Sequence, residues 1–505
     1  MKLPPRSTIN VAAMSVVCLI CVGMAISAVW NYEKGHAENK QYYQTLEEDR
    51  GSLEARKQSV AVTQSDEYLA NVSPEVARFL RMLPKDSSGT SEEELASLAR
   101  SLSELRRDWK PTYTVMLLEI AMQYRVYDRL MIPFLAEMTG QKIGYNQMSL
   151  LPWIWKEIPD VHPDYLEFKA QLYSHVDKEF VHYFQGRPDT RIRSDEIVWG
   201  GVMLEQIPRL SHPLAMPARE AIWMGDDDIV FGLKINGESR AYPRRIYAYH
   251  ELIQDRLGGV EIVTPYCTMC ESVNVYEAEL NGGKHDLRTS GFIYRSNKLM
   301  YDVATHSMWS SVSGEPVVGS LVKQKLKLKR HPVQTATWKK WREAHPDTTV
   351  ISINTGFSRD YNEGVAYSDY HRTPLLWFPV PAPDARLPEK HLVLAIPSAD
   401  SQRLPVAIDR DFLQDHPVYV AKHGDSFSLV LTDRKSGCRV YAIPPLDFAE
   451  PITDQTISDT TGRKWSISDE TLASPGAENC LRIPAHEIYW LPWVSHNPET
   501  LLLPE

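Results

Sequence analysis

The chain has 505 residues, a formal net charge of -10 at pH 7 and a sequence pI near 5.9. Hydrophobic residues make up 43% of it and charged residues 24%, the proportions of a folded protein of about two to four domains. Because acidic residues outnumber basic ones, the composition does not indicate a basic surface for nucleic acid, and we exclude nucleic acid as a partner.

The N-terminal segment predicts a membrane anchor. Residues 11–30 contain no charged side chain, and about 20 such residues span ~30 Å of hydrocarbon as a helix. Lys2 and Arg6 precede this span without any acid, so residues 1–10 are expected to stay in the cytoplasm. We therefore expect an uncleaved signal anchor, single-pass in the cell inner membrane, with the body on the periplasmic, extracytoplasmic side. Disulfides are permitted in that compartment.

A helical region is predicted between the anchor and the rest of the body. Residues 31–63 are polar and helix-prone, which indicates a stalk. Within 64–187, Ser73 before a proline and Ser91 before three glutamates are typical of helix starts. Apolar residues between 114 and 124 recur at helical spacing. We predict that residues 64–187 form an all-α domain.

The hydrophobic pattern of the sequence changes after about residue 188. Short alternating runs with turn residues predict strands, and Asn236-Gly237 predicts a tight hairpin. The remainder of the chain is therefore expected to be mainly β, with short helices such as 335–345. The predicted fold class is α+β, with one N-terminal transmembrane helix, an all-α domain and a duplicated mainly-β body.

The duplication is read from the spacing of tryptophans and prolines. One set has intervals of six, three and five residues, and a second set repeats those intervals: Pro332, Trp338, Trp341 and Pro346, then Pro484, Trp490, Trp493 and Pro498. Such internal similarity usually means paired or stacked structural units. We predict a first β-rich unit at 188–380 and a second, degenerate one at 381–505, in which the shared residues serve packing.

The pair Cys267 and Cys270 belongs to the first unit only. Of the six cysteines, only this pair has the spacing of a dithiol or metal clamp outside the apolar N-terminal run. A redox CxxC pair usually begins a helix, whereas residues 272–278 alternate like a strand. A zinc ribbon would need a second pair. A soft metal, with copper as Cu(I) first, and a redox or structural disulfide remain as alternatives.

Other residues are candidates to complete this site. His250 is the first choice for a third ligand or general base if Gly258-Gly259 forms a turn, and Met269 offers a thioether to copper. His285 and His306 are weaker candidates because they lie in polar, loop-like sequence.

The stretch 290–302, which also occurs only in the first unit, offers hydrogen-bond donors for an anion or substrate. These candidate contacts are Ser290, Arg295, Asn297 and Lys298. The structural alternative is a polar β-loop in which Arg295 pairs with Asp302.

Several stretches resemble the bacterial family catalogued as domain of unknown function 3179. They are 195–201, 235–243, His250-Glu251, Tyr266 to Cys270, 290–302, Trp309 and 314–319. The resemblance covers most of 150–380, and segments 135–141 and 162–169 resemble the helical N-terminal extension of longer members. The family often has proline after its first cysteine, where this chain has Thr268. The resemblance implies kinship and no reaction.

Three functions are consistent with the sequence. The first is a membrane-anchored, extracytoplasmic protein with a CxxC site for copper, serving metal delivery, sensing or electron transfer. The second is a non-catalytic accessory or scaffold subunit of a membrane protein complex, with the cysteines in a structural disulfide. The third is a thiol oxidoreductase. No Ser-His-Asp motif or phosphate loop is present, so the sequence assigns no enzymatic activity.

Overall fold

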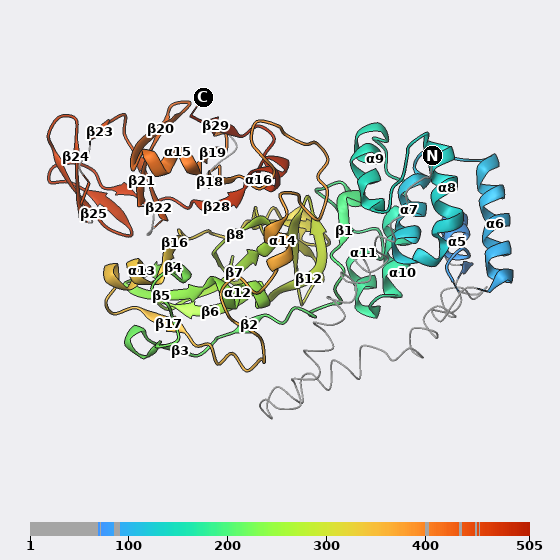
Figure 1. The fold of residues 1–505 in the computed structure, drawn as a ribbon, viewed down its shortest axis with the longest axis horizontal. Helices are drawn as coiled ribbons and strands as arrows, with labels where there is room; N and C mark the ends of the chain where they lie inside the picture. Colours follow the sequence, from blue (N-terminus) through green and yellow to red (C-terminus); the bar gives the residue numbers. More distant parts are fainter. Residues whose placement is uncertain are drawn as a thin grey trace, which may run out of the picture.

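The computed structural model describes residues 69–70, 72–84, 91–398, 403–433, 437–449, 452–453 and 455–504. They form a mixed α+β protein, with helices in the N-terminal part and sheets in the remainder (Figure 1). The predicted anchor at 11–30 and stalk at 31–63 lie outside the described residues. Among the helices that are described, none combines the length and apolar character needed to cross a bilayer.

The N-terminal part is a bundle of short helices. They are α5 Pro74–Leu80, α6 Glu92–Arg107, α7 Tyr113–Gln123, α8 Asp128–Thr139, α9 Leu151–Glu157, α10 Tyr165–Ser174 and α11 Val181–Phe184. Both predicted helix starts are confirmed. The Ser73 hydroxyl accepts from the backbone N–H of Val76, and Ser91 forms a reciprocal capping box with Glu94.

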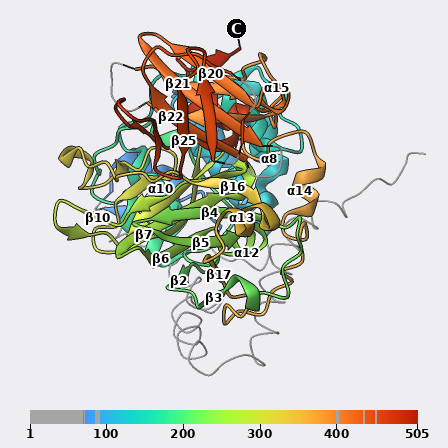
Figure 2. The same ribbon diagram turned by 90° about the vertical axis from the view of Figure 1, so that its left-hand side faces the viewer.

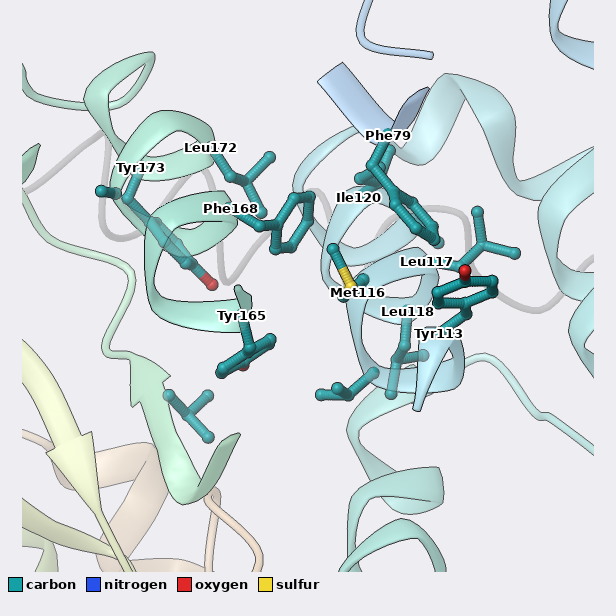
Figure 3. Packing of buried hydrophobic residues seen from close by; sticks show 14 of the residues in the cluster. Phe79, Tyr113, Met116, Leu117, Leu118, Ile120, Tyr165, Phe168, Leu172 and Tyr173 are labelled. Carbon is teal, nitrogen blue, oxygen red and sulfur yellow. The ribbon is translucent and has the colours of Figure 1, made fainter. Parts of the chain in front are cut away.

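The bundle core continues into the first β-rich unit. Figure 3 shows Phe79 of α5, Met116 and Leu117 of α7 and Phe168 of α10 packed together. At the other end of this cluster, the ring of Phe180 contacts Phe292 of strand β12 (Leu287–Tyr294) at 4.9 Å between centroids. The helices and that strand therefore share one apolar core.

The first β-rich unit contains three five-stranded sheets and a small hairpin of β10 (Glu279–Leu280) and β11 (Gly283–Lys284). In the sheet that contains β12, the strand order is β1 (Ile197–Trp199), β12, β13 (Asn297–Asp302), β14 (Met308–Ser310) and β15 (Pro316–Val318). A second has the order β16 (Gln334–Thr337), β4 (Ile229–Ile235), β5 (Glu238–Pro243), β17 (Thr349–Ile351) and β3 (Ala215–Pro217). The third joins β2 (Leu210–Ser211), β6 (Leu252–Leu257), β7 (Val260–Cys267) and β8 (Ser272–Val273), with β9 (Tyr276–Glu277) also on β7.

Local sequence explains the hairpins of this unit. Asn236 and Gly237 both have positive φ, 48° and 84°, and connect β4 to β5, so the predicted tight hairpin is confirmed. Gly258 and Gly259 likewise have positive φ and connect β6 to β7. The short helices α12 (Arg244–His250), α13 (Trp338–Ala344) and α14 (Ser368–Arg372) complete the unit.

The second β-rich unit repeats a sheet of the first. Its strands β28 (His486–Tyr489), β18 (Leu392–Ile396), β19 (Val406–Asp409) and β29 (Leu501–Leu503) occur in that order, like β16, β4, β5 and β17. Strand β17 is parallel to β5 and strand β29 is parallel to β19, whereas the other pairings in the two sheets are antiparallel. Helix α15 (Arg410–Asp415) follows β19 as α12 follows β5, and α16 (Trp490–His496) follows β28 as α13 follows β16.

Two further sheets complete the second unit. One joins β20 (Val418–His423), β21 (Ser426–Asp433) and β22 (Gly437–Ile443). The other has the order β23 (Phe448–Ala449), β24 (Thr456–Asp459), β25 (Lys464–Ile467), β26 (Thr471–Ala473) and β27 (Cys480–Leu481). Figure 2 shows this unit, in orange and red, lying over the green and yellow strands of the first unit.

The repeated tryptophans are packing residues in both units. Trp341 and Trp493 are buried, and each indole N–H donates to a threonine hydroxyl seven residues later, Thr348 or Thr500, at 2.9 Å. A buried indole N–H without a partner would destabilise the fold, so this bond explains why the spacing recurs. Trp309 and Trp465 are also buried, as expected for core residues.

Candidate functional site

The two thiols are held by a tight loop between β7 and β8. Strand β7 ends at Cys267, one turn of 3-10 helix spans Thr268–Cys270, and Glu271 adopts a left-handed conformation with φ 51°. The strands on either side pair in antiparallel register, with Cys267 opposite Ser272. This closed loop places both cysteines beneath the surface, where Cys267 is 3% exposed and Cys270 is 0% exposed.

Both cysteines are free thiols in contact with one hairpin tip. The Cys270 thiol donates to the carbonyl of Ser296 at 2.9 Å, and the side-chain amide of Asn297 donates to its sulfur at 3.1 Å. Cys267 Sγ lies 3.9 Å from the same Ser296 carbonyl. Burial, and then the neighbouring Cys267, raise the pKa of Cys270 well above that of an ordinary thiol. Cys270 is therefore a protonated, uncharged thiol at neutral pH.

The hairpin tip that meets the thiols is a two-residue turn without glycine. Arg295 and Ser296 connect β12 to β13 with φ of 47° and 60°. Such positive values favour glycine or asparagine, so tertiary contacts must hold this turn. Arg295 donates to the Glu196 carboxylate at 2.6 Å and to the carbonyl of Ser495 in α16 at 2.5 Å. An unfavourable turn that is fixed from outside is typical of a functional position.

A buried ion pair lies beside the dithiol. The Lys298 ammonium donates to Glu251 Oε2 at 2.8 Å, and the Tyr367 hydroxyl donates to Glu251 Oε1 at 2.7 Å. Glu251 follows α12 with φ 54°, and its negative charge contributes to the raised pKa of Cys270. The thiols thus face an amide and a carboxylate whose charge is compensated by a lysine.

The second β-rich unit covers the thiols. Cys267 and Cys270 belong to one apolar cluster with Val393 and Ala395 of β18, Ile488 of β28 and residues of α16. Met269 is half-buried against this cluster, and the Tyr370 hydroxyl donates to its backbone carbonyl at 2.6 Å. The dithiol therefore lies at the interface between the two units, with the thioether of Met269 at the same interface.

His250 is directed into a different set of contacts. Its Nδ1 lies 2.7 Å from the carbonyl of Pro208 and its Nε2 lies 2.6 Å from the Tyr361 hydroxyl. Within the described part of the chain, no third histidine, cysteine, aspartate or glutamate forms a ligand cluster with the two thiols. The predicted turn at Gly258-Gly259 does form, but it pairs the strands without placing the imidazole on the sulfurs.

The four predicted anion contacts separate into two groups. Asn297 and Lys298 lie beside the dithiol, as described above. Ser290 instead donates to the Leu299 carbonyl at 2.7 Å, next to an irregular register between β12 and β13. The side chain of Arg295 pairs with Glu196, and its predicted alternative partner Asp302 contacts His285 at 2.9 Å. His306 stacks on Tyr301.

Sequence reasoning did not select several residues of this site. Glu251 accepts from both Lys298 and Tyr367, and Ser311 holds Asn297 by donating to its Oδ1 at 2.5 Å. In the sequence, Glu251 is distinguished only as the residue after His250 in one of the stretches that resemble the family. Ser311 and Tyr367 carry no local pattern, because their contacts join positions far apart in the chain.

The burial of His250 predicts an acid-dependent loss of stability. Burial lowers the pKa of His250 to about 3, against about 6.5 in the unfolded chain. Its contribution is fully present above pH 6.5 and is lost as the pH falls toward 3, because only the unfolded state then binds the proton. We expect His250→Gln to flatten the pH dependence of the unfolding free energy, by up to ~1.4 kcal/mol per pH unit below pH 6.5.

Urea unfolding of the full-length chain at pH 7.5, 6 and 5 measures this difference. The exposed His416, whose Nδ1 contacts the carbonyl of Phe412 in the preceding helix, provides the control variant His416→Gln, which removes an imidazole that is not buried. Parallel profiles for wild type and His250→Gln would contradict the assigned burial effect.

The comparisons with known proteins give one match. A family model described as "Protein of unknown function (DUF3179)" matches residues 204–500. This match extends through the second β-rich unit and begins later than the resemblance noted from the sequence, so the helical bundle lies outside it. No curated protein and no solved structure matches the chain.

Proposed function

Since the chain belongs to the DUF3179 family, whose description names no activity, we propose a function from the site itself: Cys267 and Cys270 bind a soft metal ion, with Cu(I) as the first candidate. The observation that carries this proposal is the pair of free, fully buried thiols with an amide N–H directed at one sulfur. Thiolate ligands select Cu(I) among available metals. N–H donors to ligating sulfur are the usual outer contacts of such sites.

Unpartnered polar groups support a bound species at this place. The hydroxyls of Thr268 and Ser296 are buried without a hydrogen-bond partner. Both belong to residues that adjoin the sulfurs, Thr268 in the loop between them and Ser296 through its carbonyl. Buried hydroxyls without a hydrogen-bond partner are rare in native proteins, so a bound species at this place would explain them. Met269 would supply the third soft ligand from the same interface.

A thiol oxidoreductase is less well supported. Thiol exchange requires a thiolate that is accessible and whose pKa is near or below the ambient pH. Here burial raises the pKa of Cys270, and the second β-rich unit covers both sulfurs. Metal binding can compensate such a pKa because the metal displaces the thiol protons.

The cellular setting completes the proposal. We place the body outside the cytoplasm, anchored by residues 11–30 in the inner membrane, where the site would serve metal delivery, sensing or electron transfer. The alternative is an accessory subunit of a membrane protein complex, for which a Cys267–Cys270 disulfide would be only structural. That alternative predicts partner binding that survives replacement of both cysteines by serine.

Metal analysis tests the proposal. The full-length chain, purified without chelator from copper-supplemented cells, is expected to contain about one copper per chain, since two thiolates form one site. Cys267→Ser is expected to lose this copper. Cys438→Ser is the matched control, because Cys438 is also a buried free thiol, with its pKa raised to about 11 by burial. Copper retained in Cys267→Ser, or thiols counted as oxidised in metal-free wild type, would reject the metal site.

A further inference from the structure

The two β-rich units have separate hydrophobic cores. Among the described residues, three apolar clusters belong to the first unit alone, a fourth joins that unit to the helical bundle, and two belong to the second unit alone. The cluster that joins the two β-rich units is the one that contains the thiols. A unit with its own core can stay folded when it moves away from its neighbour.

The interface between the units is incompletely packed. A groove of about 520 Å³ lies between β14 and β15 of the first unit and β18, β21 and α16 of the second. Protein interiors normally contain few voids larger than a water molecule. The units are therefore not joined by one continuous close-packed core.

Buried polar groups also weaken the interface. Strand β28 of the second unit lies against β8 and β16 of the first (Figure 1). Among the described residues, both ring nitrogens of His486 in β28 are buried without a hydrogen-bond partner. Burial, and then the charge of Arg330 in the first unit, lower the pKa of His486 well below its usual value. Water can pair with this imidazole only if the units separate, so its burial favours opening.

Polar contacts hold the units together at one carboxylate of the second unit. Asp469 Oδ2 lies 2.9 Å from His345 Nε2 and 3.3 Å from Lys234 Nζ, and both partners belong to the first unit. The side chains of His345 and Asp469 are 6% and 14% exposed, so solvent screens this contact only weakly. We call these two contacts the Asp469 latch. The contact of Arg295 with the Ser495 carbonyl also crosses the interface.

A long connection joins the two units. Residues 352–391 lie between β17 and β18, and within this described stretch α14 is the only helix or strand. Most connections in compact domains are about 4–6 residues long, and longer ones are usually functional. A connection of this length allows the second unit to move while the chain stays intact.

We propose that the second β-rich unit is a lid over the dithiol, which opens as one body from the first unit when the Asp469 latch releases. In the closed arrangement Cys267 and Cys270 are 3% and 0% exposed, so a metal carrier cannot reach them. Opening exposes both sulfurs and leaves each unit folded on its own core. The opening does not depend on what the thiols bind, whereas its role in metal entry rests on the function proposed above.

Thiol alkylation tests the opening. The metal-free, reduced, full-length chain in detergent is treated with N-ethylmaleimide under native conditions, and mass spectrometry gives the rate at each cysteine. Cys438 is the reference, because it is a free thiol in a cluster formed by the second unit alone. It is 8% exposed, so a closed, static structure predicts that it reacts before Cys267 and Cys270.

The lid predicts the opposite order. We expect Cys267 and Cys270 to react at least about 10-fold faster than Cys438, because opening requires less free energy than unfolding of the second unit. Equal rates at the three cysteines, or a faster reaction of Cys438, would overturn the proposal.

A double variant tests the latch. Lys234→Met/His345→Leu removes both first-unit partners of Asp469 and leaves its contact with Arg482 inside the second unit. We expect the two thiols under the lid to react about 10-fold faster than in wild type, with no change at the reference thiol. An equal acceleration at the reference would show that the second unit unfolds instead of moving as one body. Unchanged rates at the two thiols would overturn the role of the latch.

Lys329→Met/His331→Leu is the matched control. Both side chains contact Glu277, at 2.6 and 2.8 Å, and all three residues belong to the first unit. This variant removes the same two kinds of side chain from one carboxylate and leaves the Asp469 latch intact. We expect wild-type alkylation rates, and an acceleration equal to that of Lys234→Met/His345→Leu would overturn the latch.

Copper uptake separates this inference from the proposed metal site. The same chains receive Cu(I) from a complex with a chromophoric chelator, and we expect Lys234→Met/His345→Leu to fill about 10-fold faster than wild type, with the same final copper content. Alkylation as expected without any copper uptake would reject the metal site and keep the lid. Copper uptake with equal alkylation rates in both chains would keep the metal site and overturn the lid.

Discussion

Cys270→Ser is expected to lower the affinity of the chain for Cu(I) by at least about 100-fold, because even the loss of an outer-shell contact can change metal affinity by 10- to 100-fold. Cys270 is the sulfur that meets both the Ser296 carbonyl and the Asn297 amide. A serine hydroxyl is a hard ligand with little preference for Cu(I). Competition with a chromophoric Cu(I) chelator, under reducing conditions and with the full-length chain, measures the affinity.

A variant of Asn297 is expected to weaken Cu(I) binding less than Cys270→Ser does. Asn297→Leu removes the amide donor and leaves both thiols, so we expect a smaller loss, about 10-fold or more. Ser311 anchors the amide from the other side, and Ser311→Ala should therefore act in the same direction as Asn297→Leu. Cys480→Ser, at a buried thiol of the second unit, should leave the affinity unchanged. If Cys270→Ser and Cys480→Ser bound Cu(I) equally, the copper proposal would fail.

Lys298→Met is expected to lower the free energy of unfolding by about 3–5 kcal/mol, because it leaves the Glu251 carboxylate buried without its counter-ion. The side chains of Lys298 and Glu251 are 7% and 10% exposed, and their charged atoms are 2.8 Å apart. The Tyr367 hydroxyl alone would then face the carboxylate. Chemical denaturation of the full-length chain, followed by tryptophan fluorescence, measures the change.

Two further variants separate the ion pair from general packing. The double variant Glu251→Gln/Lys298→Met removes both charges, and we expect it to recover most of the lost stability. Lys329→Met breaks an exposed ion pair with Glu277, where the lysine side chain is 69% exposed, and should cost about 0–1 kcal/mol. A Lys298→Met chain as stable as Lys329→Met would show that the buried pair does not hold this part of the fold.

The family match covers the thiol site. It spans 204–500, which includes the thiols, the buried ion pair and the second unit that covers them. The site therefore belongs to the part of the chain that carries the family pattern, whereas the helical bundle, which packs on β12, lies outside it.

Short sequence patterns were enough to predict several local elements of this protein. Helix starts at Ser73 and Ser91 and the Asn236-Gly237 hairpin depend on neighbouring residues, so they could be predicted from short patterns. The spacing of tryptophans also predicted buried positions, and the indoles of Trp341 and Trp493 each reach a threonine only seven residues away. The proximity of Cys267 to Cys270 follows from their separation of three positions.

The surroundings of the thiols, in contrast, depend on contacts between distant parts of the chain. Asn297 lies 27 positions from Cys270, and Lys298 lies 47 positions from Glu251. The cover over both sulfurs comes from the second unit, including Ile488 and Trp490. Contacts at such separations depend on how sheets pack, and hydrophobic patterning fixes which face is buried but not which partner meets it. For the same reason His250, although close in sequence to the β6–β7 hairpin, directs its ring to Pro208 and Tyr361 instead of the thiols.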